Sequence, residues 1–176
     1  MQIGIAAHSE EVPEVLYEDV DELLRIIKSR CQSPVLILGG YWGLMKHVVD
    51  RAFELSIPSV LVLPAEHENV NPPSGVVLIR TGMEYRARSV PLVRSSDVLI
   101  VLGGSAGTMI EALMGYAMGK EVFVLKGHGL PSDKLESLGE YVDNRRNGII
   151  KFYEDVRSLA EDLCRAGKRM GYGNYG

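Results

Sequence analysis

Short apolar runs alternate with stretches of helical spacing along most of the chain. The apolar runs are rich in β-branched residues and are bounded by glycine, proline or polar residues, which is typical of strands. They occupy residues 3–6, 35–38, 59–63, 76–79, 98–102, 122–125 and 149–152. Between them, apolar residues recur every three or four positions, the repeat of an amphipathic helix. Helices are therefore predicted over residues 12–29, 44–55, 84–94, 108–118 and 155–166, with a short one over 132–138.

This alternation of strands and helices indicates βαβ units, which build parallel sheets. The run VLIVL over residues 98–102 has no polar position and fits a strand that is covered on both faces. The pattern therefore predicts an α/β fold, a Rossmann-like doubly wound parallel sheet of about seven strands with helices on both faces. Pro91 is expected to kink or end its helix.

One domain is predicted for the whole chain, residues 1–176, because no repeat or linker divides it. Residues 64–74 are long and rich in turn formers for an α/β connection. The glycine-rich end, from about residue 167 to residue 176, is predicted to be a mobile tail unless an oligomer contact orders it.

Composition and charge narrow the function classes. Hydrophobic residues make up 46% of the chain and charged residues 24%, which is ordinary for a globular protein. The net charge of −4 gives no sign of the basic stripe that is typical of nucleic-acid-binding proteins. No apolar run approaches the roughly 18 residues that span a bilayer, and no signal peptide is recognisable. No nucleic-acid or membrane partner and a cytoplasmic location are therefore expected.

The cysteine usage fits the same compartment. The chain has two cysteines, Cys31 and Cys164, without CxxC spacing. They are expected to be free thiols in a reducing cytoplasm, rather than a disulfide or a metal pair.

Glycine-rich stretches follow two of the predicted strands and lead into helices. They read GGYWG at residues 39–43 and GGSAGT at residues 103–108. Ligands of open α/β sheets bind beyond the carboxyl ends of the strands, and the first amides of a helix attract anions. Candidate phosphate- or nucleotide-binding residues are Ser9, Gly39, Gly40, Gly43, Gly103, Gly104, Ser105, Gly107 and Thr108. The glycines alone would also fit tight turns, and neither GxGxxG nor GxxxxGK[ST] is present.

Charged residues near the second glycine stretch have two interpretations. Thr108 and Glu111 have the spacing of a capping box, in which the carboxylate returns to the helix N-terminus. Alternatively, Glu111 faces the ligand and holds a water or offsets a developing cation. Arg86 and Arg88 lie on the preceding predicted helix, from which one or both can reach the same cleft.

Histidines and the tryptophan carry weaker signals. His47, His67 and His128 show no metal-ligand spacing and are interpreted as ordinary polar residues. His8 follows the first strand and therefore lies nearer the expected site. Trp42 fits core packing somewhat better than stacking on a base. No metal or redox cofactor is expected.

Together with Arg88, the two glycine stretches make the sequence resemble the LONELY GUY (LOG) family, whose motif is PGGxGTxxE. The matching stretch here is GGSAGTMIE over residues 103–111, and the family's upstream arginine falls on Arg88. The family's GGxxGLM is matched by residues 39–45. Gly103 stands where the motif has proline, and Ser105 where it has its second glycine. With these two differences, the stretch resembles that of a small single-domain branch of bacterial and archaeal relatives more than that of the plant enzymes.

The resemblance implies a function. Characterised LOG members are phosphoribohydrolases that release the base from nucleoside 5'-monophosphates, and they usually form dimers. On this pattern Arg88 and Glu111 are catalytic, the second glycine stretch holds the 5'-phosphate, and no cofactor is needed. A homodimer or higher homo-oligomer is expected. Two alternatives remain: a nucleotide or molybdenum-cofactor carrier that breaks no bond, as some relatives of similar fold are, or a structural oligomer with vestigial loops.

Overall fold

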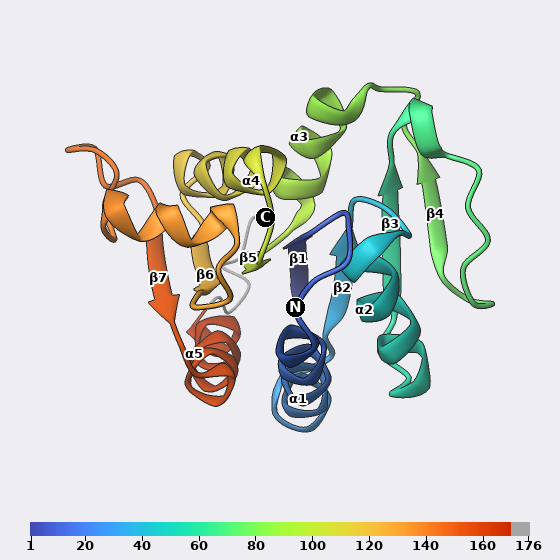
Figure 1. Ribbon diagram of the computed structural model, residues 1–176, viewed down its shortest axis with the longest axis horizontal. Helices are drawn as coiled ribbons and strands as arrows, with labels where there is room; N and C mark the ends of the chain where they lie inside the picture. Colours follow the sequence, from blue (N-terminus) through green and yellow to red (C-terminus); the bar gives the residue numbers. More distant parts are fainter. Residues whose placement is uncertain (170–176) are drawn as a thin grey trace, which may run out of the picture.

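A seven-stranded, all-parallel sheet forms the centre of the protein, as the computed structural model in Figure 1 shows for residues 1–169, the part of the chain that is described. The strand order is β4-β3-β2-β1-β5-β6-β7. The strands are β1 (Gln2–Ala7), β2 (Val35–Leu38), β3 (Ser59–Leu63), β4 (Val77–Arg80), β5 (Val98–Leu102), β6 (Glu121–Leu125) and β7 (Ile149–Tyr153). The predicted α/β fold class is confirmed.

Helices cover both faces of the sheet. In Figure 1, α1, α2 and α5 lie on one side of the strands, and α3, α4 and η2 lie on the other. The α-helices are α1 (Glu14–Arg30), α2 (Gly43–Glu54), α3 (Tyr85–Ser95), α4 (Ala106–Ala117) and α5 (Val156–Arg169). Two 3-10 helices complete the described part: η1 (Ala65–His67) and η2 (Pro131–Leu138).

Most element boundaries follow the apolar pattern. The strands predicted over residues 35–38, 59–63 and 98–102 have those bounds in the structure. Pro91 lies inside α3, which continues to Ser95. The irregular segment 64–74 contains η1. The tail predicted from about residue 167 falls mainly on residues 170–176, outside the described residues.

Alternate residues of each strand serve two separate cores. In β5, Val98, Ile100 and Leu102 belong to the cluster under α1, α2 and α5. Leu99 and Val101 face the other way, into the cluster under α3 and α4. All five residues are buried, which explains why the pattern of this strand shows no polar position.

The two cysteines correct one sequence-based expectation. Cys31 and Cys164 form a disulfide, with their Cα atoms 4.8 Å apart. The prediction of free thiols is therefore wrong. The disulfide forms because α1 and α5 pack side by side in the tertiary structure, which brings together residues that are 133 positions apart. The disulfide also removes the support that free thiols gave to a cytoplasmic location, which stays a prediction.

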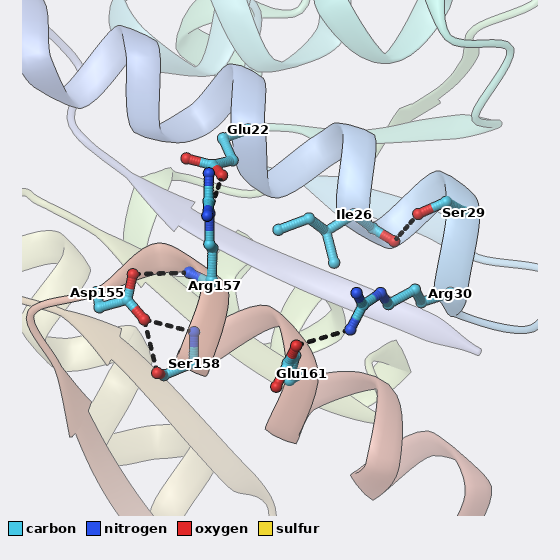
Figure 2. A network of polar contacts seen from close by, with 8 residues as sticks. All are labelled: Glu22, Ile26, Ser29, Arg30, Asp155, Arg157, Ser158 and Glu161. Atoms are coloured by element: carbon cyan, nitrogen blue, oxygen red, sulfur yellow. Dashed lines mark hydrogen bonds and ion pairs between the residues drawn. The ribbon is translucent and has the colours of Figure 1, made fainter.

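Polar contacts follow the same junction, which we call the α1–α5 seam (Figure 2). Arg157 of α5 is hydrogen-bonded to Glu22 of α1. Arg30 Nη1 lies 2.7 Å from Glu161 Oε1. Asp155, just before α5, accepts hydrogen bonds from the amide and hydroxyl of Ser158 and so caps the helix; Ser29, within α1, donates to the carbonyl of Ile26.

Among residues 1–169, no helix has the length and apolar content that a membrane crossing requires.

Candidate functional site

A cleft of about 460 Å³ opens where the order of the strands reverses. β1 pairs with β2 on one side and with β5 on the other. The chain first adds β2, β3 and β4 on one side of β1, and then continues with β5 on the opposite side. Ligands of doubly wound sheets bind at this switch point, and the volume is in the range of small-molecule sites. The lining residues are Ala7, Ser9, Glu10, Gly39, Trp42, Met45, Tyr85, Arg86, Arg88, Ser89, Ser105, Ala106, Gly107, Thr108 and Glu111.

A buried ion pair lies in this cleft. Arg88 Nη1 is 3.2 Å from Glu111 Oε1, and the two side chains are only 8% and 11% exposed. Ser89 Oγ donates a second hydrogen bond to the same carboxylate oxygen, at 2.7 Å. A Cβ atom on Gly39 would lie 1.9 Å from Arg88 Nη1, so only glycine leaves room for the guanidinium here. Two side chains of α3 thus hold the carboxylate of α4, and the turn after β2 makes room for the guanidinium.

Burial works against both charges of the pair. It raises the pKa of the Glu111 carboxyl, although Arg88 and the Ser89 hydrogen bond oppose the shift. It lowers the pKa of Arg88, which Glu111 opposes. Arg88 Nε is also buried and has no hydrogen-bond partner among the described residues. Buried donors are nearly always paired, so an unpaired one inside a cleft marks a functional candidate.

The N-terminus of α4 opens into the cleft without a side-chain cap. The N-cap residue is Ser105, and its side chain makes no capping hydrogen bond. Thr108 lies inside the first turn, and Glu111 bonds to Arg88 and Ser89 instead of the helix N-terminus. The capping-box interpretation is therefore wrong. The first amides of α4 keep no intrahelical acceptor and carry the positive end of the helix dipole.

Several predicted site glycines shape the backbone instead of lining the cleft. Gly103 and Gly104 have φ angles of 62° and 134°. A Cβ on Gly104 would lie 2.1 Å from Thr108 Oγ1, so this glycine lets the threonine side chain fold back. A Cβ on Gly43 would likewise clash with the backbone of Ser9, so this glycine allows the two backbone segments to lie close together.

The predicted site residues thus divide into two groups. The cleft brings together Ser9, Gly39, Arg88, Ser105, Gly107, Thr108 and Glu111. The turns beside it contain Gly40, Gly103 and Gly104, and Gly43 begins α2.

Sequence reasoning missed Ser89 and Tyr85 as parts of the site. A signal existed for both, since residues 85, 88 and 89 share one face of a helix. Once Arg88 is assigned to the cleft, Tyr85 and Ser89 are expected to lie there as well.

The histidines take no part in a metal cluster. His47 pairs with Asp21, and His128 with Asp19. His8 is buried but does not line the cleft. No group of three or more His, Cys, Asp or Glu residues in the described part of the chain is arranged to hold a metal ion.

Fold and site together define a Rossmann-like α/β protein with a polar cleft at its topological switch point. The sequence matches the SLOG cluster4 family over residues 1–155, and the chain belongs to that family, which is related to LOG and molybdenum-cofactor carrier proteins.

The chain is also similar to individual proteins and solved structures. An uncharacterised protein of Archaeoglobus fulgidus is 33% identical over 126 residues, which cover 72% of this chain and 80% of the relative. The X-ray structure of a structural-genomics target superposes with a TM-score of 0.82 at 28% identity, covering 93% of this chain and 98% of that one. The molybdenum cofactor binding protein from Rippkaea orientalis has a TM-score of 0.73 at 23% identity, with 94% and 95% covered, and so shows the fold alone.

Proposed function

We propose that the protein hydrolyses the N-glycosidic bond of a nucleoside 5'-monophosphate. The observation that carries this proposal is the buried Arg88–Glu111 pair, set in the same cleft as the open N-terminus of α4. The helix amides with Ser105 and Thr108 suit a phosphate, and a buried carboxylate nearby suits a cationic centre.

The chemistry needs only water and the side chains of this cleft. The bond between ribose C1' and the base nitrogen breaks, and its electron pair leaves with the base, which takes up one proton from bulk water. Bulk water later receives the proton that the attacking water gives up, so the protons balance. The sugar passes through an oxocarbenium-like cation, as at other glycosidic centres. Glu111 stabilises this cation and accepts the proton of the attacking water, whose oxygen forms the new bond to C1'. The products are the free base and ribose 5-phosphate.

Arg88 has two roles in this scheme. It fixes the Glu111 carboxylate through one nitrogen, and its unpaired Nε is a donor for the phosphate or ribose. Ser89 holds the carboxylate from a second direction. Both contacts favour the ionised form of Glu111, which the proposed base needs.

Incubation with AMP and other nucleoside monophosphates tests the proposal by measuring released base. Glu111→Gln is expected to slow release by about 10²- to 10⁴-fold, the usual contribution of a general base. Glu66→Gln, at an exposed glutamate of η1, is the matched control and should leave the rate unchanged. No release by the wild type, or undiminished release by folded Glu111→Gln, would contradict hydrolysis.

A carrier of a nucleotide or of molybdenum cofactor is the second candidate. The departures at Gly103 and Ser105 from the LOG motif favour it, and the Rippkaea orientalis protein of similar fold is a molybdenum cofactor binding protein. Native mass spectrometry of freshly purified protein separates the two candidates. A retained intact ligand supports a carrier, whereas loss of added AMP with appearance of adenine supports a hydrolase.

Self-association and location belong to the same proposal. We infer a homodimer formed through α4, whose outer face includes exposed Ile110 and whose sole charged side chain, Glu111, is buried. Light scattering after gel filtration should give a dimer mass, and Ile110→Glu should give the monomer. We also infer a cytoplasmic location, in which the disulfide has to persist against the reducing thiols of that compartment.

A further inference from the structure

Three aromatic side chains gather at one side of the cleft. The ring centroids of Trp42 and His67 are 5.1 Å apart, and those of His67 and Tyr85 are 5.8 Å apart. The Tyr85 hydroxyl is hydrogen-bonded to His67 Nδ1. These residues come from the loop before α2, from η1 and from the start of α3, so the fold brings three separate segments into one aromatic wall.

Trp42 is held in position at this wall. A Cβ atom on Gly40 would lie 2.3–2.6 Å from three carbons of the six-membered ring of the indole, so glycine allows the ring to press against the backbone. Part of Trp42 packs against the core under α1, α2 and α5, yet the residue also lines the cleft. Trp42 is therefore a fixed ring with surface available to a ligand, in addition to its role in core packing.

Arg86 places a positive charge next to the aromatic wall. It follows Tyr85 on α3, and its Nη1 is 3.3 Å from the position of a Cβ on Gly107, in the first turn of α4. Arg86 makes no ion pair within 4.0 Å to another residue among those described. A cation beside the positive end of a helix dipole is unfavourable unless an anion lies between them.

From this arrangement we propose that Trp42 and Tyr85 are the residues that select the planar ring of the phosphorylated ligand, and that Arg86 is an additional ligand of its phosphate. This inference rests on the proposed phosphate site at α4 and deepens it. Bases stack on aromatic side chains regardless of sequence because every base has a π-face. A purine, a pyrimidine and a pterin share this chemistry, and the test compares a pyrimidine with a pterin.

The test uses the protein's single tryptophan, Trp42, as its reporter. The wild-type protein is titrated with ribose 5-phosphate, with pseudouridine 5'-monophosphate and with neopterin monophosphate, while Trp42 fluorescence and heat of binding are recorded. Pseudouridine joins its ring to ribose by a carbon–carbon bond, so it stays intact in an active hydrolase. At least one ring compound is expected to quench Trp42 and to bind about tenfold or more tightly than ribose 5-phosphate.

Variants separate ring recognition from phosphate binding. Trp42→Leu should reduce the affinity for the preferred ring compound to that for ribose 5-phosphate, and leave the latter unchanged. Arg86→Gln should weaken all three compounds by a similar factor. Phe53→Leu, at an exposed aromatic residue of α2, is the control and should change neither. If Trp42→Leu weakens ribose 5-phosphate as much as the ring compounds, Trp42 is only a structural residue and the inference is wrong.

The remaining outcomes are also decisive. Equal binding of all three compounds without quenching overturns the ring site and leaves the proposed phosphate site standing. Binding of none of them overturns both. Preference for neopterin monophosphate over pseudouridine 5'-monophosphate supports the ring site and favours the carrier, whereas the opposite preference supports the ring site together with the nucleotide hydrolase.

Discussion

The cleft and the α1–α5 seam use polar residues in opposite ways. In the cleft, Arg88 and Glu111 are almost fully buried and one donor of the arginine is unpaired. In the seam, Arg30 lies opposite Glu161 (Figure 2), and the two side chains are 59% and 48% exposed. The covalent link of the seam is the disulfide. Burying a charge pair is costly, whereas an exposed pair is nearly neutral in energy. In the seam the disulfide is therefore the main stabilising link. The buried charges of the cleft have no such explanation from stability, which agrees with the function proposed for them.

The largest expected effect comes from breaking the pair in the cleft. Glu111→Leu or Arg88→Met alone leaves its partner charge buried and unpaired, which should lower the free energy of unfolding by about 3–5 kcal/mol. The double variant removes both charges and should be close to the wild type or more stable. Urea unfolding measures all four proteins. Additive losses in the double variant would show that the pair stabilises the fold, and the contrast with the seam would disappear.

Removing the disulfide should have the next largest effect. Reduction of the wild type is expected to lower the free energy of unfolding by about 2–4 kcal/mol, because the link between Cys31 and Cys164 restricts the unfolded chain. The double variant Cys31→Ser/Cys164→Ser should show the same loss and no response to reductant. Detection of free thiols in the native oxidised protein would contradict the disulfide.

The cap of α5 should contribute about 1 kcal/mol. Asp155 accepts hydrogen bonds from the Ser158 hydroxyl and amide, and these hold the pKa of its carboxyl below the usual value. A lowered pKa in the folded state means that this stabilisation is present above the unfolded pKa of about 3.9 and is lost as pH falls through the folded value. The stability difference between wild type and Asp155→Ala should shrink accordingly in acid.

Asp155→Asn is the matched variant for this test, since asparagine also caps helices but does not titrate. Its stability should stay near that of the wild type at neutral pH, and its difference from Asp155→Ala should not change with pH. If the difference between the wild type and Asp155→Ala stayed constant as the pH fell, the acid effect would belong to other carboxylates.

The smallest effect is expected for Glu161→Gln, which removes the ion pair with Arg30. Exposed pairs contribute at most about 1 kcal/mol and are screened by salt. Unfolding at low and high ionic strength should therefore show a small difference that vanishes in salt. A large, salt-independent loss would mean that the seam depends on its charges as strongly as the cleft does.

The sheet could be predicted from the sequence because its signals are local. Every residue of β5 is apolar, and the glycine stretches after β2 and β5 mark the ends of their strands. The importance of Arg88 and Glu111 came from a family resemblance, since the two residues are 23 positions apart and lie on different helices. Spacing within one helix fits a cap as well as a cleft carboxylate, and only the position of α3 beside α4 decides between them.

The disulfide could not be predicted for the same reason. Cys31 ends α1 and Cys164 lies in α5, and both helices show ordinary amphipathic patterns. Such patterns indicate which face of a helix is buried, but not which other helix lies beside it. The argument from compartment then pointed to free thiols. Trp42 was similarly ambiguous, because its contacts with Gly40, the core and His67 belong to three different parts of the chain.

The link between Cys31 and Cys164 closes a covalent ring that contains β2 to β7 and nearly all of the cleft residues. A protease that cuts once within this ring, for example in segment 64–74, releases no fragment while the sulfurs remain joined. The nicked protein should keep its full mass on a non-reducing gel and separate into two pieces only after reduction. Damage to a surface loop would then leave both walls of the binding site on one molecule.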